Sequence, residues 1–267
     1  MSETTAPTTW SGAPFGVDSF RLDGKVAIIT GASSGLGAAF AVGFARAGAD
    51  IVICARRTDK LAETAAKVEA AGRKCLAVAA DVSVVEDCQR VVDETMAAFG
   101  QVDILVNNAG IASATPTTRE KPEDYRQVLE VNLFGSYWMA QACGRVMERG
   151  SSILNVGSIL GSTTAGLPQA AYASSKSAII GLTRDLAQQW AERKGIRVNA
   201  LAPGFFTTEM VHQYVEGYLE TQIAQRVPMR RAGDPEELIG PAVFLSSDAA
   251  SYVTGVLLPV DGGTLTT

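Results

Sequence analysis

KVAIITGASSGLG, at Lys25–Gly37, is the stretch that decides the fold of this chain. Its first half, Lys25–Thr30, is a short β-branched run that ends at a glycine, and such a run is typical of a buried strand. Its second half holds three glycines and leads into Leu36–Ala47, where the apolar residues have helical spacing. Because the N-terminus of a helix presents free N–H groups and a positive dipole end, a glycine-rich turn here predicts a site for the phosphates of a nucleotide. The alternative is a tight strand–helix turn that binds no ligand.

The alternation of apolar strands and helices continues along the chain. Further strands are predicted at Ala49–Ala55, Lys74–Ala80, Val102–Val106, Ser152–Gly157, Ile196–Ala202 and Gly255–Val260. Helices are predicted at Asp59–Ala71, Val84–Phe99, Pro122–Glu148, Ala171–Lys194 and Pro235–Ser246, with a helical insertion over 205–226. The strands are continuous apolar runs, as expected when both faces of a parallel sheet are covered. The pattern predicts an α/β fold: a Rossmann-type doubly wound parallel sheet of about seven strands, in a single domain over residues 21–267 that holds both cofactor and substrate.

The composition excludes several classes of function. With 23 basic and 28 acidic residues the net charge is −5, and no basic run favours binding to nucleic acid or to an anionic membrane surface. No apolar run approaches the roughly eighteen residues needed to span a bilayer. Residues 1–20 have neither the apolar core nor the basic start of a secretory signal, so they are predicted to be a flexible extension of a cytoplasmic protein.

Cysteine and histidine usage argues against a metal. The four cysteines, Cys54, Cys75, Cys88 and Cys143, contain no C-x-x-C pair and are interpreted as small buried hydrophobes in a reducing compartment. His212 is the single histidine, too few for a typical zinc site or a Ser-His-Asp triad. We interpret it as an ordinary residue of a loop or helix, with a substrate contact as the alternative.

Three residues suggest proton transfer: Ser158, Tyr172 and Lys176. Positions i and i+4 of a helix share a face, so Tyr172 and Lys176 can point into the same cleft. A cation about 5 Å away, in an effective dielectric of about 20, stabilises a phenolate by about 3 kcal/mol, most of what is needed to bring a phenol with a pKa of about 10 close to neutrality. Singly, each residue has a structural explanation, such as a strand-end hydrogen bond or a solvated charge. Their joint spacing favours catalysis.

The end of the second strand bears on the choice of dinucleotide. An NAD site usually carries an acidic residue there for the ribose 2′-OH. This chain has Arg56 and Arg57 instead, while Asp50 comes too early and Asp59 too late. Arg56 can form charge-assisted bonds to a 2′-phosphate, so NADP(H) is favoured over NAD(H). The alternative is that the two arginines are a solvated pair at the start of a helix.

Residues 20–263 resemble a classical short-chain dehydrogenase/reductase. The resemblance is carried by TGASSGLG at Thr30–Gly37, Asp81-Val82, NNAG at Asn107–Gly110, Asn132, Ser158, YASSK at Tyr172–Lys176 and Pro203-Gly204. It implies a catalytic set in which Tyr172 is the acid or base, Lys176 binds the nicotinamide ribose and depresses the tyrosine pKa, and Ser158 holds the substrate oxygen. Asn132 would hold a water in a proton relay.

The same resemblance implies a set of cofactor contacts. Asp81 would bind the adenine amino group with Val82 beside it, Asn108 would lie by the adenosine ribose, and the segment after Gly204 would meet the carboxamide. The implied cofactor residues are Gly31, Ser33, Ser34, Gly35, Leu36, Gly37, Arg56, Asp81, Val82, Asn108, Gly110, Tyr172, Lys176, Pro203, Phe206, Thr207 and Thr208.

These observations predict an oxidoreductase that transfers a hydride between NADP(H) and a carbonyl or secondary alcohol. An NAD(H)-dependent alcohol or polyol dehydrogenase is the alternative within the family, and a catalytically silent dinucleotide sensor or scaffold is the alternative outside it. Phe205–Arg231 is predicted to cover the substrate with an apolar wall formed by Phe205, Phe206, Met210, Tyr214, Tyr218 and Met229. The alternative is that several of these side chains only bury the segment against the domain. The resemblance implies a homotetramer, with a dimer second, built on the two long helices.

Overall fold

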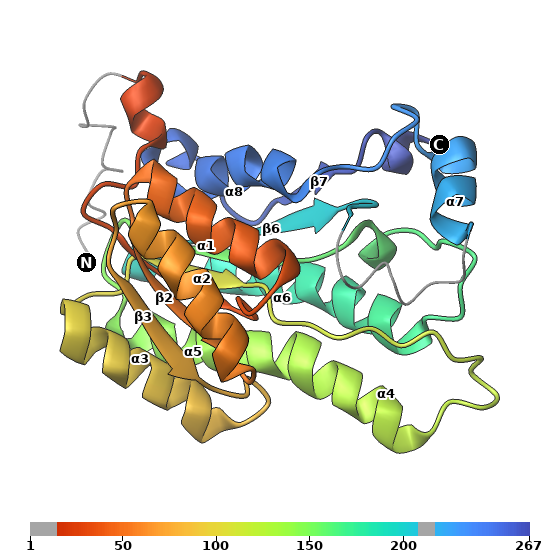
Figure 1. The fold of residues 1–267 in the computed structure, drawn as a ribbon, viewed down its shortest axis with the longest axis horizontal. Coiled ribbons are helices and arrows are strands. Elements are labelled where there is room, and N and C mark those ends of the chain that lie inside the picture. Colours follow the sequence, from red (N-terminus) through yellow and green to blue (C-terminus); the bar gives the residue numbers. More distant parts are fainter. Residues whose placement is uncertain (1–14, 208–216) are drawn as a thin grey trace, which may run out of the picture.

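The computed structural model describes residues 15–207 and 217–267, and this part of the chain contains one parallel sheet of seven strands (Figure 1). The strand order is β3-β2-β1-β4-β5-β6-β7. The strands are β1 (Val26–Thr30), β2 (Asp50–Ala55), β3 (Cys75–Ala79), β4 (Ile104–Asn107), β5 (Ser152–Val156), β6 (Arg197–Pro203) and β7 (Leu257–Val260). The order reverses between β1 and β4, and ligands of doubly wound sheets bind beyond the carboxyl ends of the strands at such a point. The predicted fold class and the predicted strands are confirmed.

Helices cover both faces of the sheet (Figure 1). They are α1 (Gly35–Ala47), α2 (Thr58–Ala70), α3 (Val85–Phe99), α4 (Pro122–Leu129), α5 (Gly135–Val146), α6 (Ala170–Lys194), α7 (Tyr218–Arg226) and α8 (Ile239–Ser246). Single turns of helix lie at Val17–Phe20 (η1), Ile159–Gly161 (η3), Pro235–Leu238 (η5), Asp248–Ala250 (η6) and Thr264–Thr266 (η7).

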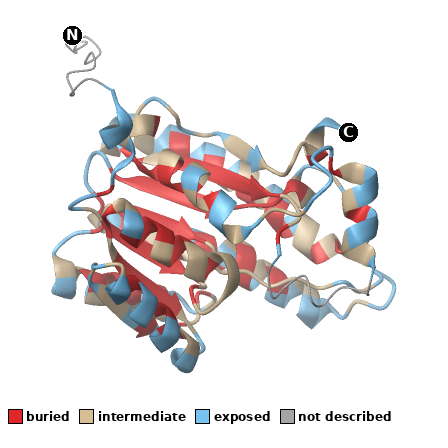
Figure 2. Ribbon diagram, turned by 45° about the horizontal axis from the view of Figure 1, so that its top comes forward, coloured by how far each residue is buried: buried red, intermediate tan, exposed pale blue. Residues whose placement is uncertain are grey.

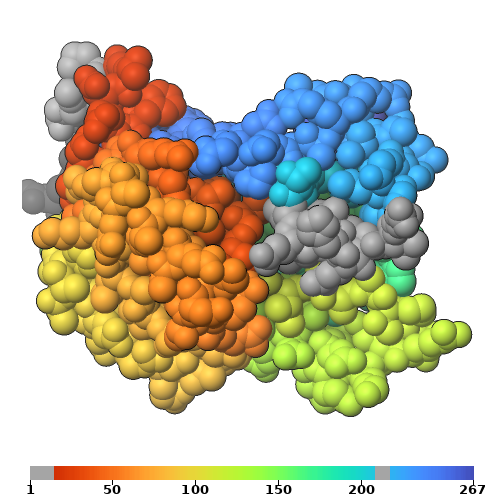
Figure 3. Space-filling view, in the orientation of Figure 1, coloured from red at the N-terminus to blue at the C-terminus, as the bar shows by residue number. Residues whose placement is uncertain are grey.

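Two apolar cores lie on either side of the sheet, because successive strand residues point to opposite faces. Ala27 and Ile29 of β1 pack with α1, α2 and α8. Val26 and Ile28 pack with α3, α5 and α6. Figure 2 shows the result: buried strands between helices that expose their outer sides. In the space-filling view, the red-to-yellow N-terminal segments and the blue C-terminal segments occupy different sides of one face (Figure 3).

The helix predicted over Pro122–Glu148 is helical without a gap from Pro122 to Val146, but it is not α-helical throughout. It consists of α4, a π-helical turn at Glu130–Phe134, and α5, which ends at Val146. A β-carbon on Gly135 would lie 2.7 Å from Val82 Cγ2, so the helix passes very close to the segment after β3 at this point. Turns of this kind often occur at functional sites, and this one holds Asn132. Helical periodicity in the sequence does not distinguish such a turn from an α-helix.

The ends of the predicted insertion and extension are only partly described. Of the insertion over 205–226, the structure gives α7; Thr208, Met210, His212 and Tyr214 lie outside the described residues. Of the N-terminal extension, it gives η1 and the Phe20 ring, whose centroid is 6.1 Å from that of Phe244 on α8.

Candidate active site

A cavity of about 200 Å³ opens at the carboxyl ends of the central strands. It unites the two groups of residues that the sequence singled out, since the glycine turn forms one side and the Ser-Tyr-Lys set the other. From the predicted set it is lined by Ser34, Gly35, Leu36, Gly37, Asn108, Gly110, Ser158, Tyr172, Lys176, Pro203 and Phe206. One cavity therefore offers both a phosphate-type turn and acid–base groups.

The glycines of this turn let the backbone pack closely against its neighbours and against a ligand. Gly31 has a φ of 66°, a region that favours glycine. A β-carbon on Gly37 would lie 2.4 Å from the Gly31 carbonyl oxygen and 2.5 Å from Nδ2 of Asn108, so no side chain fits there. Asn108 braces the turn from behind, because its Nδ2 donates to the Thr30 carbonyl at 2.9 Å and its backbone N–H donates to Thr30 Oγ1 at 3.0 Å.

A second cavity of about 180 Å³ continues from the first, and the two share Gly110. From the predicted set it is lined by Gly31, Ser33, Arg56, Asp81, Val82 and Gly110. Residues of the glycine turn line both cavities, and Arg56 and Arg57 line the second. These residues fit a dinucleotide, whose pyrophosphate would meet the N-terminal amides of α1.

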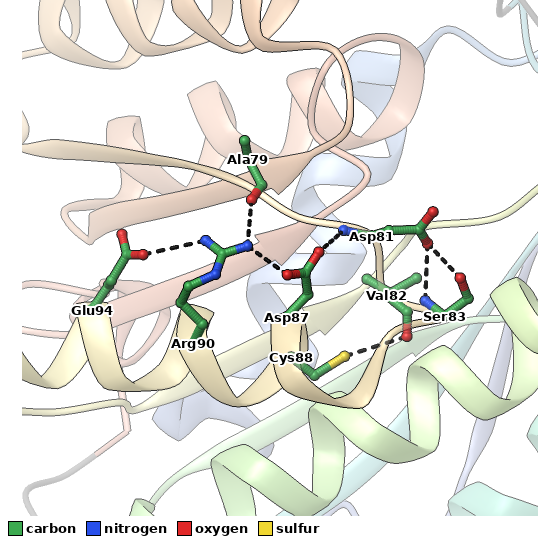
Figure 4. Close-up of polar contacts among 8 residues, drawn as sticks. All are labelled: Ala79, Asp81, Val82, Ser83, Asp87, Cys88, Arg90 and Glu94. Carbon is green, nitrogen blue, oxygen red and sulfur yellow. Dashed lines mark hydrogen bonds and ion pairs between the residues drawn. The ribbon is translucent and has the colours of Figure 1, made fainter.

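Hydrogen bonds from α3 hold Asp81 in the second cavity (Figure 4). Its backbone N–H donates to Asp87 Oδ2 at 2.8 Å, and its own Oδ1 accepts from the N–H and the hydroxyl of Ser83. Arg90 donates to Asp87 at 2.6 Å and to the Ala79 carbonyl at 2.8 Å. The Asp81 N–H, and next the Arg90 guanidinium, lower the pKa of Asp87, which therefore remains an acceptor. The first turn of α3 thus anchors the segment after β3.

Ser158, at the end of β5, is buried and acts as the N-cap of η3. Its Oγ accepts a hydrogen bond from the N–H of Leu160 at 3.1 Å. Among the described residues, no acceptor takes its hydroxyl hydrogen. Ser158 can therefore donate to a ligand oxygen in the cavity.

Tyr172 and Lys176 lie in the first two turns of α6. Lys176 Nζ donates to the Val156 carbonyl at 2.7 Å and lies 5.6 Å from the centroid of the Tyr172 ring. The lysine is only 5% exposed, and this burial lowers its pKa to about 8. Burial disfavours the charged form, so at neutral pH the cation persists at a cost in free energy.

Asn132 is almost completely buried in the π-helical turn. Its Nδ2 donates to the Ile111 carbonyl at 2.9 Å and to Ser175 Oγ at 3.0 Å, and its Oδ1 accepts from the Ile111 N–H at 2.8 Å. A β-carbon on Gly110 would lie 3.3 Å from Asn132 Oδ1 and 3.7 Å from Lys176 Nζ. Asn132 and Lys176 therefore meet beside Gly110, which lines the cavity that also holds Ser158 and Tyr172.

Comparisons with known proteins support this arrangement. Residues 31–265 match the family model described as "Enoyl-(Acyl carrier protein) reductase". The 2-dehydro-3-deoxy-D-gluconate 5-dehydrogenase of Dickeya dadantii (strain 3937) is 41% identical over 253 residues, which are 93% of this chain and 98% of that protein. A gluconate 5-dehydrogenase from Burkholderia cenocepacia J2315, crystallised with NADP and tartrate, has a TM-score of 0.88 at 38% identity and covers 94% of this chain and 98% of its own. A short-chain type dehydrogenase/reductase from Mycobacterium marinum has a TM-score of 0.89 at 32% identity and covers 94% and 99%.

The chain belongs to the short-chain dehydrogenase/reductase family. It is an oxidoreductase that transfers a hydride between a nicotinamide cofactor, NADP or NAD, and an alcohol or carbonyl group of a small-molecule substrate. The predicted family, enzyme class and cofactor type are confirmed.

The sequence analysis of this short-chain dehydrogenase/reductase named Arg57 but assigned the role at the 2′-phosphate to Arg56 alone. Its Nη2 donates to Ser34 Oγ at 2.6 Å and to Ser33 Oγ at 3.1 Å, and it lines the second cavity. Arg56 lines the same cavity, but its side chain is 62% exposed and its Nη1 is 3.8 Å from Asp81 Oδ2. The parallel register pairs Thr30 with Cys54. Ser33 and Arg57 each lie three residues beyond this pair. Pairing the two predicted strands in this register would therefore have placed Ser33 beside Arg57.

The far wall of the site differs from the prediction. Phe206 is buried and bridges to Gly233, while the Thr207 N–H donates to the Gly233 carbonyl at 3.2 Å and the Thr207 side chain is exposed. Met229 is largely exposed and lines a separate small cavity with Phe205 and Phe206 rather than the catalytic one. Met229, which was expected in the apolar wall, is therefore not among the residues that line the catalytic cavity.

The described residues contain no group of three metal-ligating side chains, and no helix among them has the length and apolarity to cross a bilayer. All four cysteines are free thiols. Burial raises the pKa of Cys54, Cys75 and Cys88 to about 12, so these thiols stay protonated and unreactive.

Proposed function

We propose that this enzyme uses NADP(H) to interconvert a ketone and a secondary alcohol on a polyhydroxylated, sugar-like substrate, with Tyr172 as proton donor and acceptor. One observation carries the proposal: a single cavity is lined by both the glycine turn and the Ser158, Tyr172 and Lys176 side chains. The sugar-acid substrates in the names of the similar proteins support the substrate class.

The roles of the side chains follow from their partners. When bound, the nicotinamide supplies or accepts the hydride. Ser158 donates its hydroxyl hydrogen to the substrate oxygen, because its acceptor side is engaged by Leu160. Tyr172 gives a proton to that oxygen during reduction and takes one from it during oxidation.

Lys176 makes the tyrosine suited to this task. Lys176 Nζ lies 5.6 Å from the centroid of the Tyr172 ring, and a unit charge at about that range, in an effective dielectric of about 20, favours the phenolate form of Tyr172 by about 3 kcal/mol. The Val156 carbonyl fixes one Nζ–H and leaves the others for the nicotinamide ribose. We further propose that Asn132 holds a relay water. Asn132 Oδ1 accepts one hydrogen bond, from the Ile111 N–H, and lies beside Gly110, where it can accept a second from a water.

A panel of ketoses, sugar acids, polyols and simple ketones, assayed with both dinucleotides in both directions, tests the function. We expect turnover of polyhydroxylated substrates, with a higher kcat/KM for NADP(H) than for NAD(H). If the protein binds NADP(H) tightly but turns over no member of the panel, a silent dinucleotide-binding protein is the better explanation.

Arg57→Ala should weaken NADP(H) binding about 10- to 100-fold and leave NAD(H) binding within about twofold. The reason is that charge-assisted bonds to a 2′-phosphate are worth about 1.5–3 kcal/mol and are absent with NAD(H). Fluorescence titration of both dinucleotides measures this. Arg56→Ala is the matched control and should have the smaller effect, since Arg56 Nη1 lies 3.8 Å from Asp81 Oδ2, whose charge offsets its own. Equal losses for the two dinucleotides in Arg57→Ala would contradict the assignment.

The assembly is proposed to be a homotetramer, with a dimer as the second possibility. Phe134 and Tyr137 are exposed aromatic residues around the start of α5, and Tyr252 and Val256 are exposed near the edge strand β7. Two separate apolar surfaces favour two interfaces. Light scattering should give four times the 28.0 kDa chain mass, and a monomer at micromolar concentration would exclude the proposal.

A cytoplasmic location is also proposed. Four free thiols support it, since secreted proteins tend to oxidise theirs. Fractionation of source cells should place the protein with the cytoplasmic markers, and recovery from an extracytoplasmic fraction would count against it.

A further inference from the structure

Ser175 lies between the two catalytic residues of α6 and is completely buried. Its Oγ donates to the Tyr172 carbonyl at 2.7 Å and accepts from Asn132 Nδ2 at 3.0 Å. A serine hydroxyl has one hydrogen to donate. Because that hydrogen is used within the helix, the remaining lone pairs are oriented toward Asn132.

The start of α6 has no side-chain cap. The helix begins after Gln169, whose side chain makes no capping hydrogen bond to the turn. The bond between Ser175 and Asn132 is a side-chain link that joins this turn to the π-helical turn. Asn132 in turn holds Ile111 by both its N–H and its carbonyl.

On its other side the π-helical turn is tied to the sheet. Ser136 Oγ donates to the Asn132 carbonyl at 2.8 Å, and Asn107 Nδ2 donates to the Ser136 carbonyl at 3.0 Å. Asn107 Nδ2 also donates to Asn155 Oδ1 at 2.9 Å, which joins the ends of β4 and β5. All these side chains are buried. In a buried network each bond is strong and each lost partner is costly, so the chain is rigid.

We propose that Ser175 is a positioning residue, which fixes Tyr172 and Lys176 relative to Asn132 and the strand ends. This inference rests on the proposed catalytic role of Tyr172. Among the described residues, Ser175 lines neither cavity, so it acts through its neighbours and not on cofactor or substrate. Loss of its hydroxyl frees the first turn of α6 to shift, and small misplacements of a catalytic group cost large factors in rate.

Ser175→Ala tests this, with Ser174→Ala as the matched control, since Ser174 is exposed in the same turn. We expect kcat to fall about 10- to 100-fold in Ser175→Ala, the dissociation constant of NADP(H) to stay within about twofold, and the kinetic pH profile to shift toward higher pH. Ser174→Ala should match the parent enzyme in all three. A folded Ser175→Ala enzyme with unchanged kcat and pH profile would overturn the proposal.

Two further measurements test the proposal if Ser175→Ala does not fold or if no substrate is turned over. Ser175→Cys leaves no cavity, because the thiol is somewhat larger than the hydroxyl; it weakens the same bond and should move kcat in the same direction. The ionisation of Tyr172, followed by tyrosinate absorbance against a Tyr172→Phe reference with NADP⁺ present, needs no substrate. It should move to higher pH in Ser175→Ala. An unchanged titration refutes the positioning role even if no substrate is turned over, and so separates it from failure of the proposed function.

Discussion

Replacing Tyr172 with phenylalanine should lower kcat about 10³-fold while weakening NADP(H) binding by less than about tenfold. The phenol lies in the cavity with Ser158 and Lys176, and general acid–base catalysis contributes typically 10²–10⁴-fold. Phenylalanine fills nearly the same volume, so hydride transfer loses its proton partner but not its geometry. Single-turnover and steady-state kinetics with a substrate from the panel measure the loss.

The control for this substitution is Tyr137→Phe, which removes an exposed hydroxyl from α5. It should leave kcat unchanged. Full activity in Tyr172→Phe would remove the basis of the proposed mechanism. A large loss of cofactor affinity without a loss of kcat would reassign the tyrosine to binding alone.

Lys176→Met should nearly abolish turnover and yet raise the free energy of unfolding at pH 7 by about 1–2 kcal/mol. The pKa of Lys176 falls from 10.5 to about 8 on folding, which corresponds to about 3 kcal/mol of destabilisation while the group is charged. Methionine removes this penalty but leaves the Val156 carbonyl without its donor, at a cost of about 1–3 kcal/mol.

The sign of the pH dependence distinguishes this explanation from ordinary packing. Between about pH 8 and 10.5 the unfolded lysine holds its proton and the folded one does not, so the stability of the parent enzyme rises with pH there. Below pH 8 both states hold the proton and the penalty is fully present. The advantage of Lys176→Met should therefore shrink or reverse by about pH 10.

Urea unfolding at pH 7 and at about pH 10 measures both effects. Lys67→Met, on an exposed face of α2, is the control and should change stability by less than about 0.5 kcal/mol at either pH. If Lys176→Met is less stable than the parent at pH 7 and gains on it as the pH rises, the buried charge does not carry the penalty that we assign to it.

Much of the fold and of the site could be predicted because the signals are local. The β-branched run at Val26–Thr30, followed by glycines and a helix, defines a strand, a turn and a helix within about twenty residues. The spacing of Tyr172 and Lys176 places them on one helical face whatever surrounds the helix. Such features depend on neighbours in the sequence, so they are visible in it.

Contacts between distant segments could not be predicted in this way. The role of Asn132 depends on Ile111 and Ser175, which are 21 and 43 residues away. The placement of Arg57 beside Ser33 depends on the pairing of β1 with β2. The periodicity of apolar residues in the sequence reveals neither contact.

The sequence by itself determined the alternating elements, the phosphate-type turn and the acid–base pair. Only the tertiary structure decided that a π-helical turn interrupts the long helix, that Arg57 approaches the serines of the turn, and that burial lowers the pKa of Lys176. The physical reason is the range of the interactions: backbone conformation follows from adjacent residues, whereas desolvation and hydrogen bonding depend on whatever the folded chain brings together.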